Sequence, residues 1–376
     1  MIQGNVLQGN DPNPIVQGIK DVSNALSNPT VYFILTVVLL AVYIVFRKAL
    51  TKPAVAITFL IGSVAFLVFS LFDPNFRLIV TKPDNVPIVI MLGLVLYTTW
   101  LALRRAVIND ELMKRGEPNL EAKESKDRVF TWPDLVYVEL ICMVLCTVAL
   151  VVWSIELGAP LEEPSAPSRT PNPSKAPWYF LGLQEMLVYY DPWIAGVVLP
   201  GLIIVGLQAV PYLDRNPKGN GYYTFNERPF AVAFFLFGFL VLWVSLVVLG
   251  TFLRGPNWSF FGPFQRWDIH FLEPLVNVNL SEIFWVTGLG EPLPANPLIR
   301  EIPGILVVLG YFAIAPPLLL SLSKMFRGFF LEMGVARYSI FVMLLLMELS
   351  LPIKMVLRWT FNLKYIVAFP EFFFNI

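Results

Sequence analysis

The chain has 376 residues, of which 56% are hydrophobic and only 14% are charged. Soluble domains average roughly 45–50% apolar and about 25% charged residues, so this composition predicts a membrane protein. Lys and Arg balance Asp and Glu at 27 each, which leaves no excess of basic charge and excludes nucleic acid as an expected partner.

Cysteine and histidine are too few to build a metal centre within this chain. Cys142 and Cys146 are the two cysteines, which excludes a disulfide scaffold and a cysteine-rich zinc site. Their spacing places them on one face of an apolar helix, where we interpret them as buried packing residues. His270 is the single histidine. A haem held by two histidines therefore needs ligands from another subunit, and we expect no metal site here.

The first 30 residues are polar and lack the basic start and short apolar core of a secretory signal.

Runs of roughly 17–25 apolar residues are long enough to cross a bilayer. Such runs predict about eight transmembrane helices, at residues 31–46, 54–72, 87–103, 134–155, 193–213, 230–252, 303–322 and 338–356. With one short interfacial helix in addition, the expected fold is an all-α membrane protein.

Basic residues in the loops predict the orientation of the spans, because short basic loops stay in the cytoplasm. The loops on the side of 104–133 hold 16 of the 27 Lys and Arg residues, whereas the opposite loops hold ten. We therefore expect the 104–133 loop in the cytoplasm and both termini on the outer side.

The outer loop at 156–177 is rich in proline, with Pro160, Pro164, Pro167, Pro171, Pro173 and Pro177. Prolines at this density favour a stiff, extended path and exclude a regular helix. The next residues, 178–190, are amphipathic and too short to span a bilayer. Since proline is favoured in the first turn of a helix, the sequence predicts a short helix at the outer membrane face.

A second outer segment, 253–300, is rich in aromatic residues: Trp258, Phe260, Phe261, Phe264 and Trp267. Aromatic rings gather at the membrane–water interface, which predicts that they anchor the loop there. A docking face for an extrinsic partner is the alternative interpretation.

Ionisable residues inside apolar spans are energetically costly and are functional candidates by default. Glu139 lies one turn into the fourth span, where we interpret it as a structural residue that reaches the inner surface. Glu348 and Lys354 share the last span, and they either neutralise each other or pair with a neighbouring subunit. His270 lies in an outer loop, where we interpret it as a solvated or loop-bonded residue.

Glu185 is the acidic residue best placed for chemistry. It lies in the short helix, seven residues after Trp178 and close to the same helix face. A carboxylate in a shallow, partly dry position suits proton acceptance, and Tyr179, Tyr189 and Tyr190 add phenolic donors nearby. Oxidation of a quinol needs such groups, because two protons leave with two electrons. The alternative is a surface glutamate that caps an interfacial helix.

The segment TPNPSKAPWYF at residues 170–180, followed by LGLQEML, resembles the quinol-oxidation loop of the cytochrome b family. That family has a Pro-Glu-Trp-Tyr signature after a proline-rich outer loop. Other motifs follow the order found in subunit IV of the cytochrome b6f complex: Trp132-Pro133-Asp134, Glu163-Pro164, Ala166-Pro167, Val210-Pro211-Tyr212 and Arg228-Pro229. The resemblance covers roughly residues 131–253, and 301–322 looks like one further helix of the C-terminal half of cytochrome b.

The resemblance implies a subunit that completes the quinol-oxidation site, while a partner binds both b haems through four histidines. The form KAPWYFLGLQE is similar to that of bacterial quinol–cytochrome c reductases with a divided cytochrome b. This similarity implies a location in a bacterial inner membrane or an internal energy-conserving membrane. The implied quinol-binding residues are Pro177, Trp178, Tyr179 and Phe180, with Tyr179 also catalytic. Ala176 and Pro177 stand where the family has Pro-Glu, so the family's proton-accepting glutamate is missing. We predict Glu185 as its replacement, with a water-linked path as the alternative.

The expected organisation has four parts: an N-terminal extension with three spans (1–130), a subunit IV-like region with the quinol-oxidation loop (131–253), an outer aromatic loop with one further span (254–322) and a C-terminal extension (323–376). The expected function is that of a subunit of a Rieske/cytochrome b quinol–cytochrome c oxidoreductase. Menaquinol or ubiquinol is the expected substrate. The expected partners are a cytochrome b subunit that holds haem b, a Rieske iron–sulfur protein, a c-type cytochrome and the lipid membrane, in a dimeric complex.

Two other classes remain as alternatives. Spans interrupted by Pro and Gly are typical of secondary transporters with a substrate site at the membrane midplane. Against this class, charges within the spans are sparse and the two halves show no internal repeat. The other alternative is a non-catalytic membrane anchor for redox partners.

Overall fold

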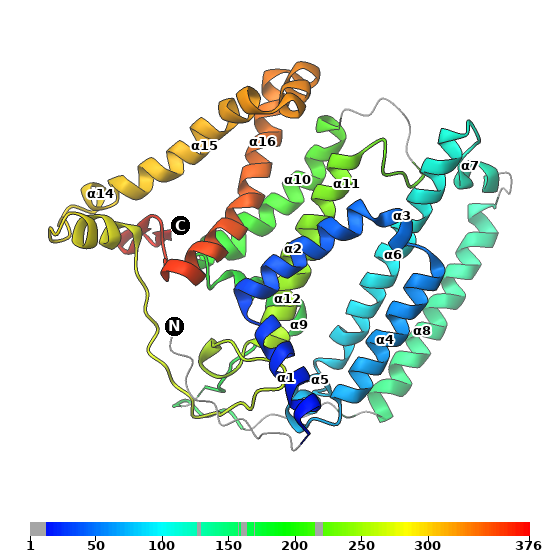
Figure 1. The fold of residues 1–376 in the computed structure, drawn as a ribbon, viewed down its shortest axis with the longest axis horizontal. Helices are drawn as coiled ribbons and strands as arrows, with labels where there is room; N and C mark the ends of the chain where they lie inside the picture. The colour runs from blue at the N-terminus through cyan, green and yellow to red at the C-terminus, as the bar shows by residue number, and fades with distance from the viewer. Residues whose placement is uncertain (1–12, 126–128, 157, 159–163, 169, 215–220) are drawn as a thin grey trace. The chain divides into compact units, whose positions relative to one another are not determined.

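The computed structural model describes residues 13–125, 129–156, 158, 164–168, 170–214 and 221–376. Pro160 and Glu163, which belong to the predicted proline-rich loop and its resemblance, lie outside these ranges. Helices dominate the described chain (Figure 1). The α-helices are α1 (Pro14–Leu26), α2 (Pro29–Val45), α3 (Arg47–Leu50), α4 (Pro53–Ser70), α5 (Pro74–Val80), α6 (Val86–Lys114), α7 (Leu120–Glu124), α8 (Val136–Glu156), α9 (Trp178–Met186), α10 (Leu199–Leu213), α11 (Pro229–Leu236), α12 (Ser245–Val248), α13 (Leu280–Glu282), α14 (Pro297–Arg300), α15 (Ile302–Leu322) and α16 (Lys324–Phe361).

The described chain also contains stretches of π-helix, most of them within spans. These are η1 (Thr131–Leu135), η2 (Ile194–Val198), η3 (Phe237–Val244), η4 (Leu249–Leu253) and η6 (Ile283–Gly288). The short 3₁₀ turns are η5 (Pro256–Trp258) and η7 (Pro370–Phe372). The strands β1 (Ala368–Phe369) and β2 (Phe374–Asn375) form a small antiparallel hairpin near the C-terminal end, with Ala368 opposite Asn375.

Many helices begin with a proline, as α1, α2 and α4 do. Proline suits this position because its missing N–H would find no partner in the first turn and its φ angle already fits a helix. Side-chain caps add to these starts. Asn13 accepts the backbone N–H of Ile15 (3.0 Å), and Asp73 accepts that of Asn75 (2.9 Å).

Within the described residues, seven helical stretches are long and apolar enough to cross a membrane. They are Pro53–Ser70, Val86–Lys114, Thr131–Glu156, Ile194–Leu213, Pro229–Leu253, Ile302–Leu322 and Lys324–Phe361. The pair α1 and α2, bent by 84°, is an eighth candidate. Each of the eight predicted spans overlaps one of these stretches or α2. The expected all-α, multi-pass membrane fold is therefore confirmed.

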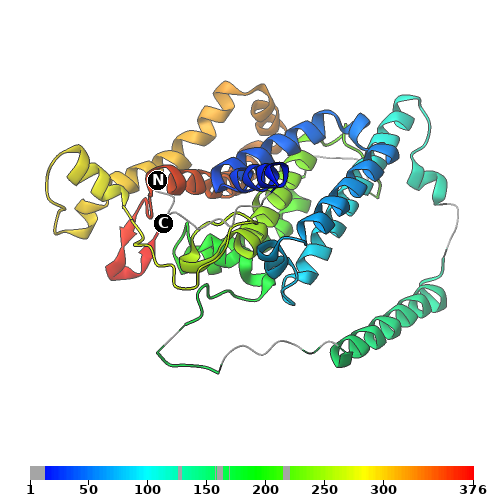
Figure 2. The same ribbon diagram turned by 60° about the horizontal axis from the view of Figure 1, so that its bottom comes forward.

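The chain divides into two compact units, and the first combines residues 1–38, 175–219 and 235–376. In this unit α15 and α16 form an antiparallel hairpin (amber and orange in Figures 1 and 2). The hydroxyls of Tyr311 and Tyr338 join the two helices by donating to the carbonyls of Leu346 (2.8 Å) and Pro316 (3.2 Å). Helix α10 packs against α16, and α9 packs across α12 and η4. This packing positions the candidate site described below.

Helix α16 is interrupted at Gly334, whose φ of 75° lies in the left-handed region open to glycine. The interruption separates residues 324–333 from the long segment 335–361, which contains the predicted span 338–356. The sequence pattern therefore located this span correctly, although the helix is extended at both ends.

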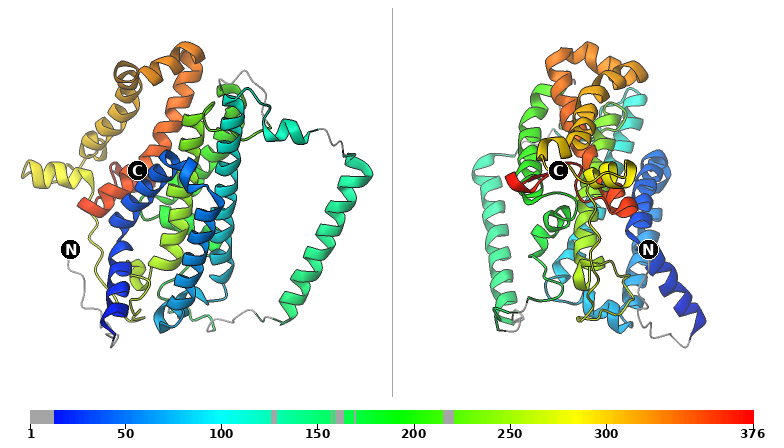
Figure 3. Two further views of the ribbon diagram at one scale, coloured as in Figure 1. Left: turned by 45° about the vertical axis from the view of Figure 1, so that its right-hand side comes forward. Right: turned by 90° about the vertical axis from the view of Figure 1, so that its left-hand side faces the viewer.

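The second unit combines residues 39–174 and 220–234. Here α3 packs against α4 and α6, which run side by side (blue and cyan in Figures 1 and 3). Beyond the predicted span end at residue 103, α6 continues as a helix and holds the loop that precedes α11. The amide of Asn109 donates to the carbonyl of Tyr223 (2.8 Å), and the carboxylate of Asp110 accepts the hydroxyl of Thr224 (2.6 Å).

Helix α8 contains no buried residue. Cys142 and Cys146 are accordingly exposed. Their interpretation as buried packing residues is wrong for this chain by itself, because the apolar surface of α8 is not covered by the rest of the described chain.

Candidate functional site

The segment 176–180 places aromatic rings in the first turn of α9. Pro177 is the N-cap residue (φ −53°, ψ 148°), and the helix begins at Trp178. The rings of Trp178 and Tyr179 meet edge to face at 5.8 Å, and those of Tyr179 and Phe180 lie 4.7 Å apart. Tyr179 is 54% exposed and Phe180 is 52% exposed. Pro177, Trp178, Tyr179 and Phe180 form what we call the aromatic edge.

The chain that leads into α9 is fixed by two polar contacts. The backbone N–H of Ala176 donates to the side-chain oxygen of Gln184 (2.8 Å), and the ammonium of Lys175 donates to the carbonyl of Thr251 (2.8 Å). Lys175 also lies 4.9 Å from the ring centroid of Trp267. Residues 170–177 contain no helix, as the prolines predict.

The opposite face of α9 is buried and carries Leu181, Gly182, Glu185 and Met186. Two glycines allow α9 to lie close to the span Pro229–Leu253. A Cβ atom on Gly182 would come within 3.3 Å of Val247, and one on Gly250 would come within 3.1 Å of the carbonyl oxygen of Leu181. Figure 1 shows α9 beside α12 in this span.

Glu185 is completely buried at 0% exposure, and four hydrogen bonds converge on its carboxylate. Arg254 donates to both oxygens, from Nε to Oε2 (3.0 Å) and from Nη2 to Oε1 (2.7 Å). The hydroxyl of Tyr189 donates to Oε1 (2.9 Å), and the indole N–H of Trp258 donates to Oε2 (3.1 Å). The alternative of a surface glutamate that caps the helix is therefore wrong. We call these four residues the Glu185 cluster.

Two residues of the Glu185 cluster, Tyr189 and Arg254, have raised pKa values. Burial, together with the negative charge of Glu185, raises the pKa of Tyr189 well above its ordinary value, so this hydroxyl remains a donor. For Arg254, burial acts to lower the pKa but Glu185 raises it, and the net pKa lies above the ordinary value. The guanidinium also lies 3.6 Å from the ring centroid of Phe260, a cation–π contact.

The aromatic segment packs in part against the chain itself, which corrects the interpretation of two of its five rings. Trp258 donates to Glu185, and Phe260 faces the guanidinium of Arg254. Phe261 and Phe264 are buried at 5% and 8% exposure. Phe261 and Phe264 are therefore covered by the chain itself and face neither a membrane nor a partner. The interpretations of Trp258, Phe260 and Trp267 as membrane anchors or as a docking face stay predictions.

The end of α9 contacts the C-terminal segment of the chain, residues 362–376. The ammonium of Lys364 donates to the carbonyls of Leu187 (3.3 Å) and Val188 (3.2 Å), which follow the last turn of α9. The amide of Asn375 donates to the carboxylate of Asp191 (2.8 Å). These bonds satisfy carbonyls that a helix end leaves without partners.

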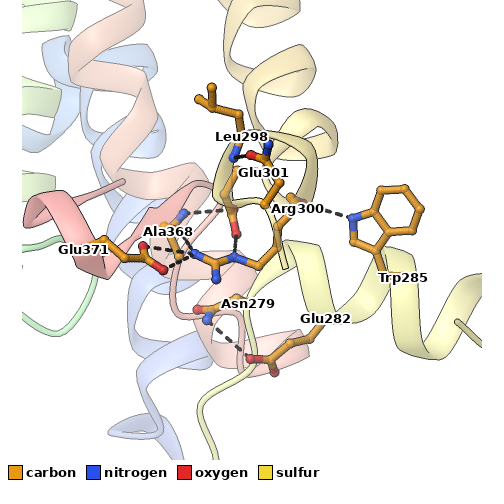
Figure 4. Close-up of polar contacts among 9 residues, drawn as sticks. Asn279, Glu282, Trp285, Leu298, Arg300, Glu301, Ala368 and Glu371 are labelled. Atoms are coloured by element: carbon orange, nitrogen blue, oxygen red, sulfur yellow. Dashed lines mark hydrogen bonds and ion pairs between the residues drawn. The ribbon is translucent and has the colours of Figure 1, made fainter. Parts of the chain in front are cut away.

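The same C-terminal segment is tied to the start of α15 by the ionic contacts drawn in Figure 4. The buried carboxylate of Glu301 accepts the backbone N–H of Ala368 (2.9 Å) and pairs with Arg300 (3.1 Å). Arg300 also pairs with Glu371 (3.2 Å) and donates to the carbonyl of Ala368 (3.2 Å). The hairpin β1–β2 is thus held from two directions, by α15 and by Asp191 after α9.

The structure separates the predicted site residues into two groups. Pro177, Trp178, Tyr179 and Phe180 lie together at the start of α9, whereas Glu185 lies on the buried face of the same helix. Sequence reasoning missed Arg254, Trp258 and Lys364. A charge directly after an apolar span was the available signal for Arg254, but its partner stands 69 residues earlier in the chain.

The remaining candidates from the sequence do not form a site in the described chain. His270 is exposed in an outer loop, where its backbone N–H donates to Asp268 (2.9 Å). Lys354 donates to the carbonyl of Lys364 (2.9 Å) instead of pairing with Glu348. One carboxylate oxygen of Glu348 is buried without a hydrogen-bond partner among the described residues.

The residues present do not fit a haem. The chain has one histidine, and no group of three or more His, Cys, Asp or Glu side chains gathers within the described ranges. This chain cannot supply the two axial histidines of a b-type haem, so it cannot ligate such a haem by itself.

Comparison with known proteins matches residues 164–265 to the family described as cytochrome b(C-terminal)/b6/petD. No solved structure matches the chain. The matched region contains the aromatic edge and all four residues of the Glu185 cluster. It begins later than the predicted resemblance at residue 131, includes the start of the outer aromatic loop, and leaves out 301–322. Residues 164–265 of this multi-pass membrane protein are therefore similar to the C-terminal domain of cytochrome b.

Proposed function

We propose that this chain is the cytochrome b C-terminal-type subunit of a quinol–cytochrome c oxidoreductase, in which quinol binds at the aromatic edge. The observation that carries the proposal is the exposure of Tyr179 and Phe180 at the start of a short helix inside the family region. Flat aromatic rings offer stacking partners for a quinol ring, and the Tyr179 hydroxyl offers a hydrogen bond to a ring oxygen.

The proposed reaction oxidises quinol to quinone and releases two electrons and two protons. One electron goes to a Rieske iron–sulfur protein on the outer side, and the other goes to the low-potential haem b of a separate haem-bearing subunit. The two protons leave on the outer side. The contribution of this chain is to bind and orient quinol at 177–180, and the redox chemistry belongs to groups held by its partners.

Glu185 as acceptor of a quinol proton stays a prediction. Its carboxylate already receives four hydrogen bonds, so acceptance requires the ion pair with Arg254 to open when quinol binds. The geometry also supports a second role, in which Glu185 acts as a positioning residue. In that role it holds α9 against the end of the span Pro229–Leu253 and so fixes the aromatic edge.

The test is quinol-dependent reduction of cytochrome c by the purified complex, with kcat and KM measured across pH. Tyr179→Phe removes the exposed hydroxyl and should raise KM for quinol while the haem spectra stay intact.

Glu185→Gln removes proton acceptance but leaves Arg254 without a counter-charge. The double variant Glu185→Gln with Arg254→Gln therefore accompanies it, because it removes both charges. Glu273→Gln, at an exposed outer position, is the control and should leave turnover unchanged.

The two roles of Glu185 predict different results. A proton acceptor predicts that kcat falls strongly and its pH profile changes in both Gln variants, with assembly intact. A positioning residue predicts that the double variant regains most of the kcat that the single variant loses. Normal kinetics in Tyr179→Phe would contradict the proposed quinol contact. A complex without quinol oxidation and without co-purified haem b would contradict the whole proposal and favour a transporter.

A further inference from the structure

Helix α1 (Pro14–Leu26) carries an apolar stripe that the described chain leaves open. Ile15, Ile19, Val22 and Leu26 follow one another at intervals of four, three and four residues, which places them on one face of a helix. Their side chains are 73%, 42%, 58% and 44% exposed. The helix itself is well defined by its cap at Asn13.

The polar side of α1 is held by the chain's own outer loop. Asn24 lies on the face opposite the stripe, and its side-chain oxygen accepts the backbone N–H of Phe264 (3.1 Å). A Cβ atom on Gly262 would overlap the Asn24 side chain, so the loop backbone lies directly against it. Gln17 and Asp21 bond each other on this polar side (2.8 Å). The contacts with the loop therefore direct the apolar stripe away from this loop.

The angle between α1 and α2 sets the orientation of the stripe relative to a membrane. Helix α2 has 17 residues, which is long enough to cross the hydrocarbon core without α1. Transmembrane helices tilt by about 20° on average from the bilayer normal. With a bend of 84° between the two helices, α1 lies close to the membrane plane at the outer end of α2.

We propose that α1 is an interfacial helix whose stripe, Ile15, Ile19, Val22 and Leu26, enters the outer leaflet of the bilayer that α2 spans. The occupant of the stripe is lipid because α1 is followed within three residues by α2, an apolar helix whose side chains Val31, Ile34 and Val38 are exposed and suit a membrane span. Lys20 and Asp21 leave α1 without net charge, so the driving force is apolar area and neutral phosphatidylcholine is sufficient. Through the bond between Asn24 and Phe264, this helix fixes the depth at which the loop after Arg254 lies relative to the membrane surface.

The experiment uses single cysteines on the two faces of α1 in the assembled complex. Cys142 and Cys146 are replaced by Ala, and Ile19→Cys, Val22→Cys and Asp21→Cys are introduced one at a time. Each cysteine is labelled with an environment-sensitive fluorophore, and the complex is reconstituted in phosphatidylcholine vesicles with or without brominated acyl chains. Labels at 19 and 22 should lose most of their fluorescence in brominated lipid and be shielded from aqueous iodide. The label at 21, an exposed position on the polar side, should show the opposite pattern.

Two outcomes would overturn the proposal. Labels at 19 and 22 that are shielded from both quenchers would show that another subunit covers the stripe. Labels at both positions that iodide quenches and brominated lipid does not would show a helix in water. The experiment does not involve quinol, so it is decided independently of the proposed quinol oxidation.

Discussion

At the scale of residues, the Glu185 cluster combines a buried charge pair with two neutral donors. Removing two charges from water is costly, and their attraction offsets that cost only when the geometry is good and the remaining lone pairs are satisfied. Arg254 meets this condition by reaching both carboxylate oxygens, and Tyr189 and Trp258 occupy the remaining positions. The pair therefore gives α9 one defined position on its neighbouring span.

Breaking this pair from one side should be far more damaging than removing it altogether. Arg254→Met leaves a buried carboxylate without a counter-charge and should destabilise the protein by about 3–5 kcal/mol. Adding Glu185→Leu should recover much of that loss, because no buried charge remains. The measurement is a double-mutant cycle on the denaturation midpoint of the purified complex. If the losses of stability in the two single variants simply add in the double variant, the coupling is contradicted. The control is Glu117→Gln, which removes an exposed ion pair with Lys123 and should change the denaturation midpoint little.

At the scale of elements, α9 is held at both ends, and two of the three contacts described here involve segments distant in sequence. Gln184 and Lys175 fix its entry, and Lys364 binds the carbonyls that follow its last turn. A cation at this position also complements the negative end of the helix dipole. The C-terminal extension, which lies outside the matched family region, therefore supports the helix that carries the aromatic edge.

Lys364→Met should loosen the end of α9 without unfolding the chain. Charges at helix ends contribute about 0.3–1 kcal/mol, so amide exchange in residues 186–190 should become about two- to fivefold faster. Hydrogen exchange with mass spectrometry measures this directly. Lys82→Met, which affects only an exposed pair with Asp84, is the control. Unchanged exchange at 186–190 would show that Lys364 does not stabilise the helix end.

The start of α15 offers a test of how closely the C-terminal segment packs. A Cβ atom on Gly304 would overlap the backbone carbonyl of Ile366, which has no flexible side chain to move away. Gly304→Ala should therefore cost about 1–3 kcal/mol and detach residues 366–376, measured by thermal unfolding and by proteolysis of the C-terminal end. Gly310→Ala in the same helix meets only the end of the Ile314 side chain at 3.7 Å and should be tolerated. Equal stability of the two variants would contradict this packing.

At the scale of the whole molecule, the chain is apolar enough to be membrane-embedded but cannot supply two histidine ligands to a haem. It has one histidine, and that residue is exposed in an outer loop. Helix α8 contains no buried residue. Both features agree with the proposed role of a subunit that acts together with a haem-bearing partner.

This division of labour predicts where haem b is found. The chain purified alone should show no b-type haem absorbance, because it cannot supply two axial histidines. Co-expression with the haem-bearing subunit of the same organism should yield a complex with a reducible b-type spectrum that contains this chain. Reduced-minus-oxidised difference spectra measure the haem b content of the isolated chain and of the complex. Stoichiometric haem b on the isolated chain would contradict the prediction.

The sequence by itself determined the transmembrane spans and the start of α9. A bilayer needs about 20 apolar residues per helix, so spans are visible in the composition of each segment. The helix after Pro177 also follows from local rules. The spacing of Ile15, Ile19, Val22 and Leu26 also indicates an amphipathic helix from the sequence alone. The polar composition of the first 30 residues conceals this pattern.

Only the tertiary structure decided which residues surround Glu185. The pattern placed Glu185 on α9, but it predicted a shallow, partly dry carboxylate on the face of Trp178, and no local signal named Arg254 as its partner. The same holds for Lys364 beneath α9 and for Phe261 and Phe264, which were expected at the membrane interface. A span forms against the lipid from its own residues, whereas an ion pair or a buried ring depends on how distant segments pack, and that packing leaves no periodic mark in the chain.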